Sequence, residues 1–405
     1  MNTLLRRLEA VRCRSVQGIL KLGNYCMGYR TPKYIEGPGT VRQLPRLMSK
    51  EGINDVLVVT GDSLLRSGMV DSLLRAMEQE RIRYTVYSLT LPDPTSLDVE
   101  QGYRMYVDHG CKSIVALGGG SRIDCAKGIA AKVAHPKKTV AQLQGLLKVH
   151  KQIVPFVAIP TTAGAGSETT VAAVITDAKT RHKASINAPC LIPKYAVLDP
   201  ELTVGLSSYA TATTGMDALA HAVEAYTNHT YNTKVEDQLA KEAVRLIHEN
   251  LLTAYYDGAD LPARQKMQKA AFYAGRAFTR GCVGYVHAVG HTLGGLYGVA
   301  HGLAMAVLLP HVMRQYGAAT QHRLAELAEV CGIEGTNDAA KAEGFLSWIE
   351  DANRQMGLPE KFDVIREEDI PQMIAWAKKE ANPLYPVPVI WTETEFRQLI
   401  EQIRR

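Results

Sequence analysis

The alternation of short apolar runs with helical patterns between residues 55 and 198 most restricts how this chain can fold. We expect buried strands at residues 55–60, 84–91, 112–117, 153–159 and 195–198. Apolar residues at helical spacing lie between the first three runs, at 64–82 and 97–109. Strands that follow one another through helices form a parallel sheet, and continuous apolar runs indicate that both of its faces are covered. This half of the chain therefore predicts an α/β domain, with a hairpin at 171–175 and 183–186.

The pattern changes after Pro200. Helical periodicity without a convincing strand continues toward the C-terminus, and it is clearest at 209–227, 235–254 and 262–277. The 405 residues are enough for two domains of ordinary size. We therefore expect an α/β domain over residues 31–200 and an all-helical domain over residues 201–405.

Residues 1–30 form an extension of their own. Apolar side chains recur at helical spacing, and Glu9 is the only acid among the arginines Arg6, Arg7, Arg12 and Arg14. The pattern predicts an amphipathic helix, or two, whose apolar stripe packs on the body or on a second subunit. A cleaved transit peptide has a similar composition and is the alternative.

Composition excludes several classes of function. The net charge of +5 is spread along the chain, without the basic stripe and interleaved aromatics of nucleic-acid-binding proteins. The sequence contains no run of about 18 apolar residues, which is the length that predicts a membrane span. The seven cysteines contain no CxxC pair, and no secretory signal precedes them. These features predict a cytoplasmic protein with free thiols that binds neither nucleic acid nor a membrane.

Two glycine-rich turns follow predicted strands, at residues 118–121 and 161–166. Glycine lets backbone N–H groups approach a phosphate closely, and a helix N-terminus favours an anion. One such turn is as well explained by tight turn geometry, and neither matches the GxGxxG or P-loop pattern. Because ligands bind outside the carboxyl ends of parallel strands, two turns in one sheet favour a dinucleotide.

Histidines and one aspartate gather in two short apolar segments. His287 and His291 stand four residues apart, as do Asp217 and His221, and His301 follows in a second glycine-rich stretch. Residues at this spacing share one face of a helix. A single histidine is more often structural, but one carboxylate with several imidazoles is the donor set of a divalent first-row metal. Helix geometry alone does not choose between His287 and His291 as the ligand.

Four sequence blocks, at 118–124, 160–168, 215–224 and 287–301, resemble the signature blocks of the iron-containing (group III) alcohol dehydrogenases, in the same order. The similarity extends from Tyr34 to the C-terminus. It implies the dehydroquinate synthase-like architecture, in which an N-terminal dinucleotide-binding α/β domain with a parallel sheet precedes an all-α C-terminal domain. Two positions depart from the family pattern: Ala300 replaces a usual proline, and Met305 a frequent asparagine.

The resemblance also implies roles for individual residues. It assigns the metal to Asp217, His221, His287 and His301. It leaves His291 near the site as a catalytic residue that passes a proton between the alkoxide and water. Phe278 matches a position that lines the alcohol pocket. The implied cofactor contacts are Gly118, Gly119, Gly120, Ser121, Asp124, Thr161, Thr162 and Lys183.

The implied activity is hydride transfer between NAD(P)(H) and a small primary alcohol, diol or aldehyde. A metal acts on the substrate oxygen as a Lewis acid, and the cofactor carries the hydride. The resemblance favours Fe²⁺, although the donor set also suits Zn²⁺. The expected partners are this small molecule and further copies of the chain in a homo-oligomer.

The choice between NAD and NADP depends on the end of the first predicted strand. In the family, an aspartate there favours NAD by binding the ribose 2′-hydroxyl. Gly61 occupies the position here, and Ser63 is able to donate to a 2′-phosphate. The carboxylate of Asp62 opposes binding of a 2′-phosphate if its side chain points toward the ribose. The sequence thus favours NADP over NAD.

Two other classes of function are open to a chain of this kind. A lyase of the dehydroquinate-synthase type shares the fold and needs a dense basic cluster for an anionic substrate, but only Arg276 and Arg280 lie near the site in sequence. A binding protein without catalytic activity has no need of the metal ligands, and all four of their positions are filled here.

Overall fold

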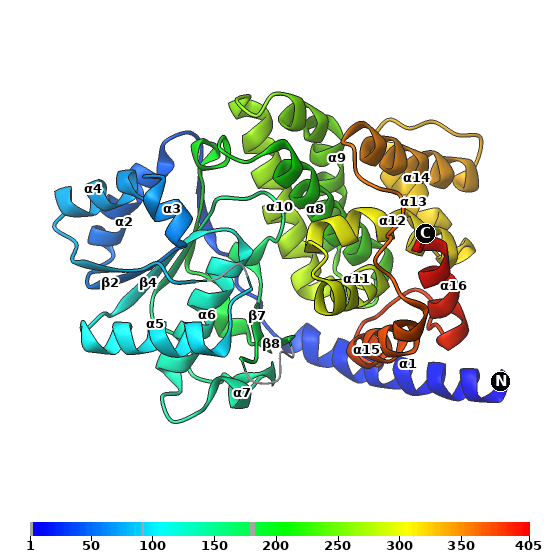
Figure 1. The fold of residues 1–405 in the computed structure, drawn as a ribbon, viewed down its shortest axis with the longest axis horizontal. Coiled ribbons are helices and arrows are strands. Elements are labelled where there is room, and N and C mark those ends of the chain that lie inside the picture. Colours follow the sequence, from blue (N-terminus) through cyan, green and yellow to red (C-terminus); the bar gives the residue numbers. More distant parts are fainter. Residues whose placement is uncertain (1–2, 91–92, 179–182) are drawn as a thin grey trace. The chain divides into compact units, whose positions relative to one another are not determined.

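The computed structural model describes residues 3–90, 93–178 and 183–405 (Figure 1). The chain divides into two compact units. The sheet unit comprises Tyr29–Leu206 and Ala259–Gln268, and the helical unit comprises Met1–Gly28, Ser207–Gly258 and Lys269–Arg405. The short segment 259–268 belongs to the sheet unit because its side chains bond there: Gln268 donates to the carbonyl oxygen of Pro160 at 3.2 Å.

A six-stranded sheet forms the centre of the sheet unit, in the order β1-β9-β6-β4-β2-β3. All of its pairings are parallel, which confirms the fold class expected from the sequence. The strands are β1 (Lys33–Glu36), β2 (Val56–Val59), β3 (Tyr84–Tyr87), β4 (Ser113–Gly118), β6 (Phe156–Pro160) and β9 (Tyr195–Leu198).

Two apolar cores cover the two faces of this sheet. Successive side chains of a strand point to opposite faces, and β2 shows this directly. Val56 and Val58 pack with α2 (Leu44–Lys50) and α4 (Asp71–Gln79), whereas Leu57 and Val59 pack with α5 (Ser96–Asp108) and α6 (Gly120–Ala134). Figure 1 shows α2 and α5 on opposite sides of the strands. Strand β2 is apolar at every position because both of its faces are buried.

A smaller sheet has the order β5-β8-β7, with β5 at Gly145–Leu146. Strands β7 (Ala172–Thr176) and β8 (Lys183–Asn187) pair antiparallel, which confirms the predicted hairpin. The residues that connect them, 179–182, lie outside the described part of the chain.

One predicted helix and one strand differ from expectation. The helix expected over 64–82 is two helices, α3 (Asp62–Arg66) and α4, because Gly68 between them has a left-handed backbone with φ +74°. The edge strand β1 was not predicted. Its four residues are partly exposed, and they become a strand only by pairing with β9, far along the chain.

The helical unit consists of helices joined by loops, with an isolated bridge between Phe362 and Arg404 in its described residues. Its helices are α8 (Ser208–Asn228), α9 (Lys234–Tyr256), the last part of α10 (Leu261–Gly281), α11 (Tyr285–Tyr297), α12 (His301–Tyr316), α13 (Ala318–Val330), α14 (Asp338–Gln355), α15 (Ile370–Ala381) and α16 (Glu393–Ile403). Helix α8 is buried on nearly all sides along most of its length. Within the described residues, no helix combines the length and apolar character needed to cross a membrane.

The N-terminal extension is a single helix, α1 (Thr3–Cys26), which packs within the helical unit. Cys13 and Gln17 on its inner face are fully buried, and Glu9 pairs with Lys378 of α15 at 3.1 Å. The expected burial of the apolar stripe is only partly fulfilled, because the outer face exposes Leu8, Val11, Ile19, Leu22 and Tyr25. Much of the apolar stripe therefore lies on the face of α1 that this chain leaves exposed.

Deleting residues 1–28 is expected to lower the thermal stability. The deletion removes the buried contacts of α1 and exposes the surface beneath it, for which a loss of about 2 kcal/mol is a conservative figure. In a domain of this size that loss lowers the Tm by roughly 4–8 °C. Differential scanning calorimetry measures the change, and Lys21→Ser, at an exposed position outside the apolar stripe, is the matched control. A truncated protein with the Tm and the oligomer size of the intact chain would contradict this role for α1.

Candidate active site

Three helices of the helical unit bring the predicted metal ligands together. Helix α8 carries Asp217 and His221 one turn apart, α11 carries His287, and α12 begins at His301. Atoms of Asp217, His221 and His287 that can bind a metal lie within 4.8 Å of one another. The Oδ1 atom of Asp217 is 3.7 Å from His221 Nδ1, 3.7 Å from His287 Nε2 and 3.2 Å from His301 Nε2. Three imidazoles therefore converge on one carboxylate oxygen.

Three of the atoms at this point of convergence have no hydrogen-bond partner in the described part of the chain. Among the described residues, Asp217 Oδ1, His221 Nδ1 and His287 Nε2 are buried and accept or donate no hydrogen bond. A buried polar atom without a partner costs about 1–3 kcal/mol. A divalent metal satisfies all of these atoms at once, and one carboxylate with three imidazoles is a donor set that Fe²⁺ and Zn²⁺ accept. The residues present therefore fit a metal.

The charge states of Asp217 and His221 also suit a metal. Burial lowers the pKa of His221 to about 3, so its ring is neutral. Burial opposes ionisation of Asp217, but His221 and His301 outweigh it and hold the pKa of Asp217 well below its ordinary value. Burial also disfavours the charged form of His287, but Glu224 and Asp217 raise its pKa to about 9. Because a ligand histidine must be neutral, a metal bound here would displace a proton from His287.

His291 stands apart from this cluster although it shares a helix face with His287. Its ring lies parallel to that of His301, with 5.3 Å between the ring centres, and it is partly exposed. Its Nδ1 atom lies 2.8 Å from Oε1 of Glu380 on α15. The structure thus places His301 against Asp217 and turns His291 toward another acid.

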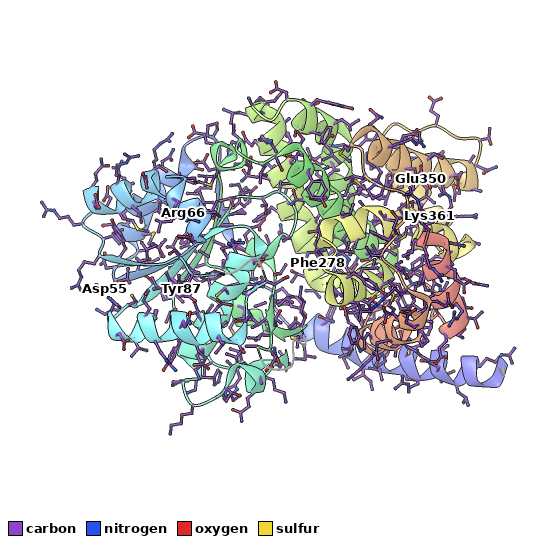
Figure 2. All side chains as sticks on the ribbon, in the orientation of Figure 1. Asp55, Arg66, Tyr87, Phe278, Glu350 and Lys361 are labelled. Carbon is purple, nitrogen blue, oxygen red and sulfur yellow. The ribbon has the colours of Figure 1, made fainter. Side chains whose placement is uncertain are left out.

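Phe278 of α10 forms an apolar wall beside the cluster. Its ring stacks on that of His221, with 4.1 Å between the centres and 12° between the planes. Figure 2 labels Phe278 among the side chains of the helical unit. An aromatic face next to the candidate metal ligands favours an uncharged substrate over an anionic one.

Glu224 is a buried residue of the site that the sequence analysis missed. Its Oε2 atom accepts from His287 Nδ1 at 2.5 Å, and its Oε1 atom accepts from the N–H of Val286 at 2.7 Å. A hydrogen bond to Nδ1 directs the other ring nitrogen toward the metal. A signal was present, because Glu224 lies seven residues after Asp217 on the same face of an otherwise apolar helix.

Gly302 brings α12 into direct backbone contact with α8. A Cβ atom at this position would overlap the carbonyl oxygen of Thr213 and lie 2.6 Å from its carbonyl carbon. Backbone atoms cannot move aside as a flexible side chain can. Only glycine fits here, and it sets the place of the neighbouring His301 relative to Asp217.

The two glycine-rich turns lie against each other at the carboxyl ends of β4 and β6, which are neighbours in the sheet. A Cβ atom on Gly119 would lie 3.2 Å from Thr162 Cγ2, and one on Gly120 would lie 2.8 Å from the Cβ of Ala165. Helix α6 starts at Gly120 without a side-chain cap, so its first N–H groups are available to an anion. The structure therefore brings together residues 118–121 and Thr161–Thr162, as expected for adjacent strand ends.

Two other expected cofactor residues are engaged within the protein. Asp124 accepts from the hydroxyl of Ser167 at 2.5 Å and from the N–H of Val174 at 2.9 Å, so each of its oxygens has a partner. Lys183 at the start of β8 donates to Asp93 at 2.7 Å. These contacts indicate that Asp124 fastens α6 to the segment after β6.

Gly61 caps the N-terminus of α3, and Ser63 lies in its first turn. The side chain of Arg122 reaches this turn, because a Cβ atom on Gly61 would lie 2.8 Å from its Nε atom. That Nε atom is buried and lacks a hydrogen-bond partner among the described residues. Asp62 pairs with Arg66 at 2.7 Å on the exposed side of α3. A cation, and not a carboxylate, therefore faces the end of β2.

Comparison with known proteins agrees with this arrangement. A family model described as iron-containing alcohol dehydrogenase matches residues 31–200, and one described as the C-terminal part of the Fe-containing alcohol dehydrogenase family matches residues 211–403. The chain is 36% identical over 343 residues to the NAD-dependent methanol dehydrogenase of Bacillus methanolicus, covering 84% of this chain and 90% of that protein.

Two further relatives extend the similarity over most of the chain. The 1,3-propanediol dehydrogenase of Citrobacter freundii is 35% identical over 388 residues, which cover 93% of this chain and 100% of that protein. The crystal structure of a 1,3-propanediol oxidoreductase matches with a TM-score of 0.89 and 35% identity, over 93% of this chain and 99% of that one. The resemblance of the four sequence blocks is thereby confirmed, and the chain belongs to the iron-containing alcohol dehydrogenase family.

Proposed function

We propose that this protein is a metal-dependent alcohol dehydrogenase, or aldehyde reductase in the reverse direction, that uses NAD(P)(H). The observation that carries the proposal is the convergence of three imidazoles on the buried Oδ1 atom of Asp217, which accepts no hydrogen bond from the described residues. Membership of the family makes the protein an oxidoreductase of the alcohol dehydrogenase type. The metal, the cofactor form and the substrate below are our proposals.

We assign the metal to Asp217, His221, His287 and His301, with Fe²⁺ as the ion that the family description favours and Zn²⁺ as the alternative. When bound, the metal supplies Lewis-acid stabilisation to the substrate oxygen. Phe278 beside His221 excludes water from one side of the site and orients the apolar part of the substrate. His291 passes a proton between the substrate oxygen and water through Nε2, because its Nδ1 is occupied by Glu380.

The proposed substrates are short primary alcohols, diols and the corresponding aldehydes. The names of the related methanol and 1,3-propanediol dehydrogenases support this size and chemistry. A lyase acting on an anionic sugar is disfavoured, because Arg280 is already engaged within the helical unit. It donates to the carbonyl oxygen of Asn24 at 2.9 Å and lies 3.5 Å from Glu236.

Anaerobic activity assays test the proposal. The purified protein is stripped with a chelator, reloaded with Fe²⁺ or Zn²⁺, and offered short alcohols with NAD and NADP and aldehydes with NADH and NADPH. We expect no turnover in the stripped protein and recovery with about one metal ion per subunit. A protein that binds no metal, or that oxidises no alcohol and reduces no aldehyde when loaded, would refute the proposed function.

We also propose that the ribose pocket prefers NADP. Arg122 beside Gly61 is suited to a 2′-phosphate, and Asp62 is held away by Arg66. Gly61→Asp is expected to shift the ratio of kcat/KM for NAD to that for NADP by roughly tenfold or more toward NAD, since one charged contact is worth about 1.5–3 kcal/mol. Steady-state kinetics with both cofactors measure the ratio.

The control for this prediction is Asp62→Asn, which alters an exposed neighbour and should leave the ratio unchanged. Arg122→Gln should lower kcat/KM for NADP more than for NAD. If the NAD to NADP ratio of kcat/KM stays the same in Gly61→Asp, or moves toward NADP, this turn does not distinguish the ribose 2′-hydroxyl from the 2′-phosphate.

We propose a homo-oligomer in the cytoplasm as the working form. The exposed apolar stripe on α1 supports assembly, and six described cysteines are free thiols, as expected in a reducing compartment. Size-exclusion chromatography with light scattering measures the assembly, and a monomer at micromolar concentration would contradict it.

A further inference from the structure

A hydrogen-bonded chain leads from His291 to side chains outside the family's signature blocks. Oε1 of Glu380 on α15 lies 2.8 Å from His291 Nδ1. The same oxygen accepts from the hydroxyl of Tyr385, four residues beyond the end of α15, at 3.0 Å. A carboxylate can only accept, so both partners must donate. Neutral His291 therefore carries its proton on Nδ1 and presents a bare Nε2.

Helix α1 holds the backbone of Tyr385. Gln17 is 1% exposed, and its Nε2 atom donates to the carbonyl oxygens of Tyr385 at 2.8 Å and Pro383 at 3.1 Å. Arg14, one turn earlier, donates to the carbonyl oxygens of Val387 and Pro388. The inner polar side chains of the N-terminal extension are thus directed to the loop that carries Tyr385.

Two buried tyrosines, one at the start of α11 and one between α8 and α9, hold the same loop. Tyr285 at the start of α11 donates to Asn382 Oδ1 at 3.0 Å, and Tyr231 donates to the carbonyl oxygen of Leu384 at 3.1 Å. With these anchors, the loop has little freedom to move relative to α11. The hydroxyl of Tyr385 is consequently supplied to Glu380 from a fixed direction.

We propose that Glu380 is a positioning residue for His291, with Tyr385 and Gln17 as its supports. Glu380 holds the imidazole in the orientation and the tautomer that leave Nε2 free to accept a proton from the substrate side. The N-terminal helix is then part of the catalytic structure. This inference rests on the proposed proton-transfer role of His291. A salt bridge that only joined α11 to α15 would affect stability and would leave the tautomer of His291 unchanged.

The tautomer is measured by ¹⁵N NMR of histidine-labelled protein loaded with diamagnetic Zn²⁺, with His291→Gln used to assign the signals. We expect a protonated Nδ1 and a bare Nε2 in the intact protein. Glu380→Ala should abolish this preference, and Glu380→Gln should largely restore it, because an amide oxygen still accepts. His322, whose Nδ1 lies 2.8 Å from Asp338 on another face, serves as an internal reference that stays constant.

Turnover gives the second readout. Glu380→Ala is expected to lower kcat by roughly tenfold or more, which is part of the effect of general acid–base catalysis, while metal content and the KM for the cofactor stay unchanged. Tyr385→Phe and Gln17→Leu should lower kcat by smaller factors in the same direction. The matched control is Tyr297→Phe. Tyr297 lies on α11, as His291 does, and like Tyr385 it donates to a carboxylate, that of Asp369, at 2.8 Å.

The possible results separate this inference from the function on which it rests. A Glu380→Ala protein with an unchanged His291 tautomer and an unchanged kcat overturns the inference, whatever its melting temperature. An unchanged kcat in Gln17→Leu would show that α1 does not support Glu380. A His291→Ala protein that turns over at the full rate with its metal in place refutes the proton-transfer role itself, independently of Glu380.

Discussion

Asp217→Asn is expected to lose the metal and nearly all activity together, and so are the single alanine variants of His221, His287 and His301. Asp217 Oδ1 is the atom on which the three imidazoles converge, and its replacement removes the only carboxylate of the group. Because Lewis-acid stabilisation is worth several kcal/mol, the rate should fall by at least about 10³-fold. Metal content per subunit and kcat, measured on the same preparations, check this.

His291→Ala is the decisive companion to these variants. It should retain the metal, because its ring is directed to Glu380, yet slow turnover by roughly 10²-fold or more if proton transfer is its role. The comparison with His287→Ala tests the assignment of the pair. Metal lost from the His291 variant and kept by the His287 variant would mean that the two histidines have exchanged roles.

Glu224→Ala is expected to weaken metal binding by about 10–100-fold, the usual effect of removing a residue that orients a ligand histidine. The change leaves His287 Nδ1 and the N–H of Val286 without their acceptor. Glu224→Gln should be almost as damaging. An amide has one accepting oxygen for two donors, and an NH₂ group facing His287 would force the proton onto the nitrogen that binds the metal.

Competition with a chelator measures the metal Kd of both variants. Glu168→Gln is the matched control, because Glu168 is an equally buried acid that belongs to the sheet unit and not to the unit that carries the histidine cluster. Unchanged affinity in both Glu224 variants would show that His287 keeps its orientation without the acid, and would assign Glu224 to the packing of α8 alone.

The fold was predictable where one residue pattern has one physical cause. The run Val56–Val59 is apolar throughout because each of its faces meets a different core. The break in the helix expected over 64–82 was not predictable from periodicity, because apolar spacing continues past Gly68 while the backbone there is left-handed. The strand at Lys33–Glu36 exists only through its pairing with Tyr195–Leu198, and no local pattern marks such a long-range contact.

The candidate site divides in the same way. Asp217 with His221, and His287 with His291, could be grouped because helix spacing alone places each pair on one face. Within the second pair, His291 differs from His287 by its contact with Glu380, which lies 89 residues beyond it. Glu224 and Glu380 were missed for this reason, since an acid gains its role from what faces it in the folded chain. A match to the family pattern does not fix a residue's contacts either. Lys183 matches a cofactor contact of the family, but in this structure it is paired with Asp93.

The direct contact of Gly302 with the backbone of Thr213 has a practical consequence for redesigning this enzyme. No side chain lies between α12 and α8 at that point, so the separation of the two helices has no adjustable spacer. Libraries that seek activity on bulkier alcohols should therefore keep glycine at 302 and place their diversity around Phe278, which we propose as a wall of the substrate pocket. We expect smaller side chains around Phe278 to broaden the substrate range, while α8 and α12 keep the positions that bring the histidines together.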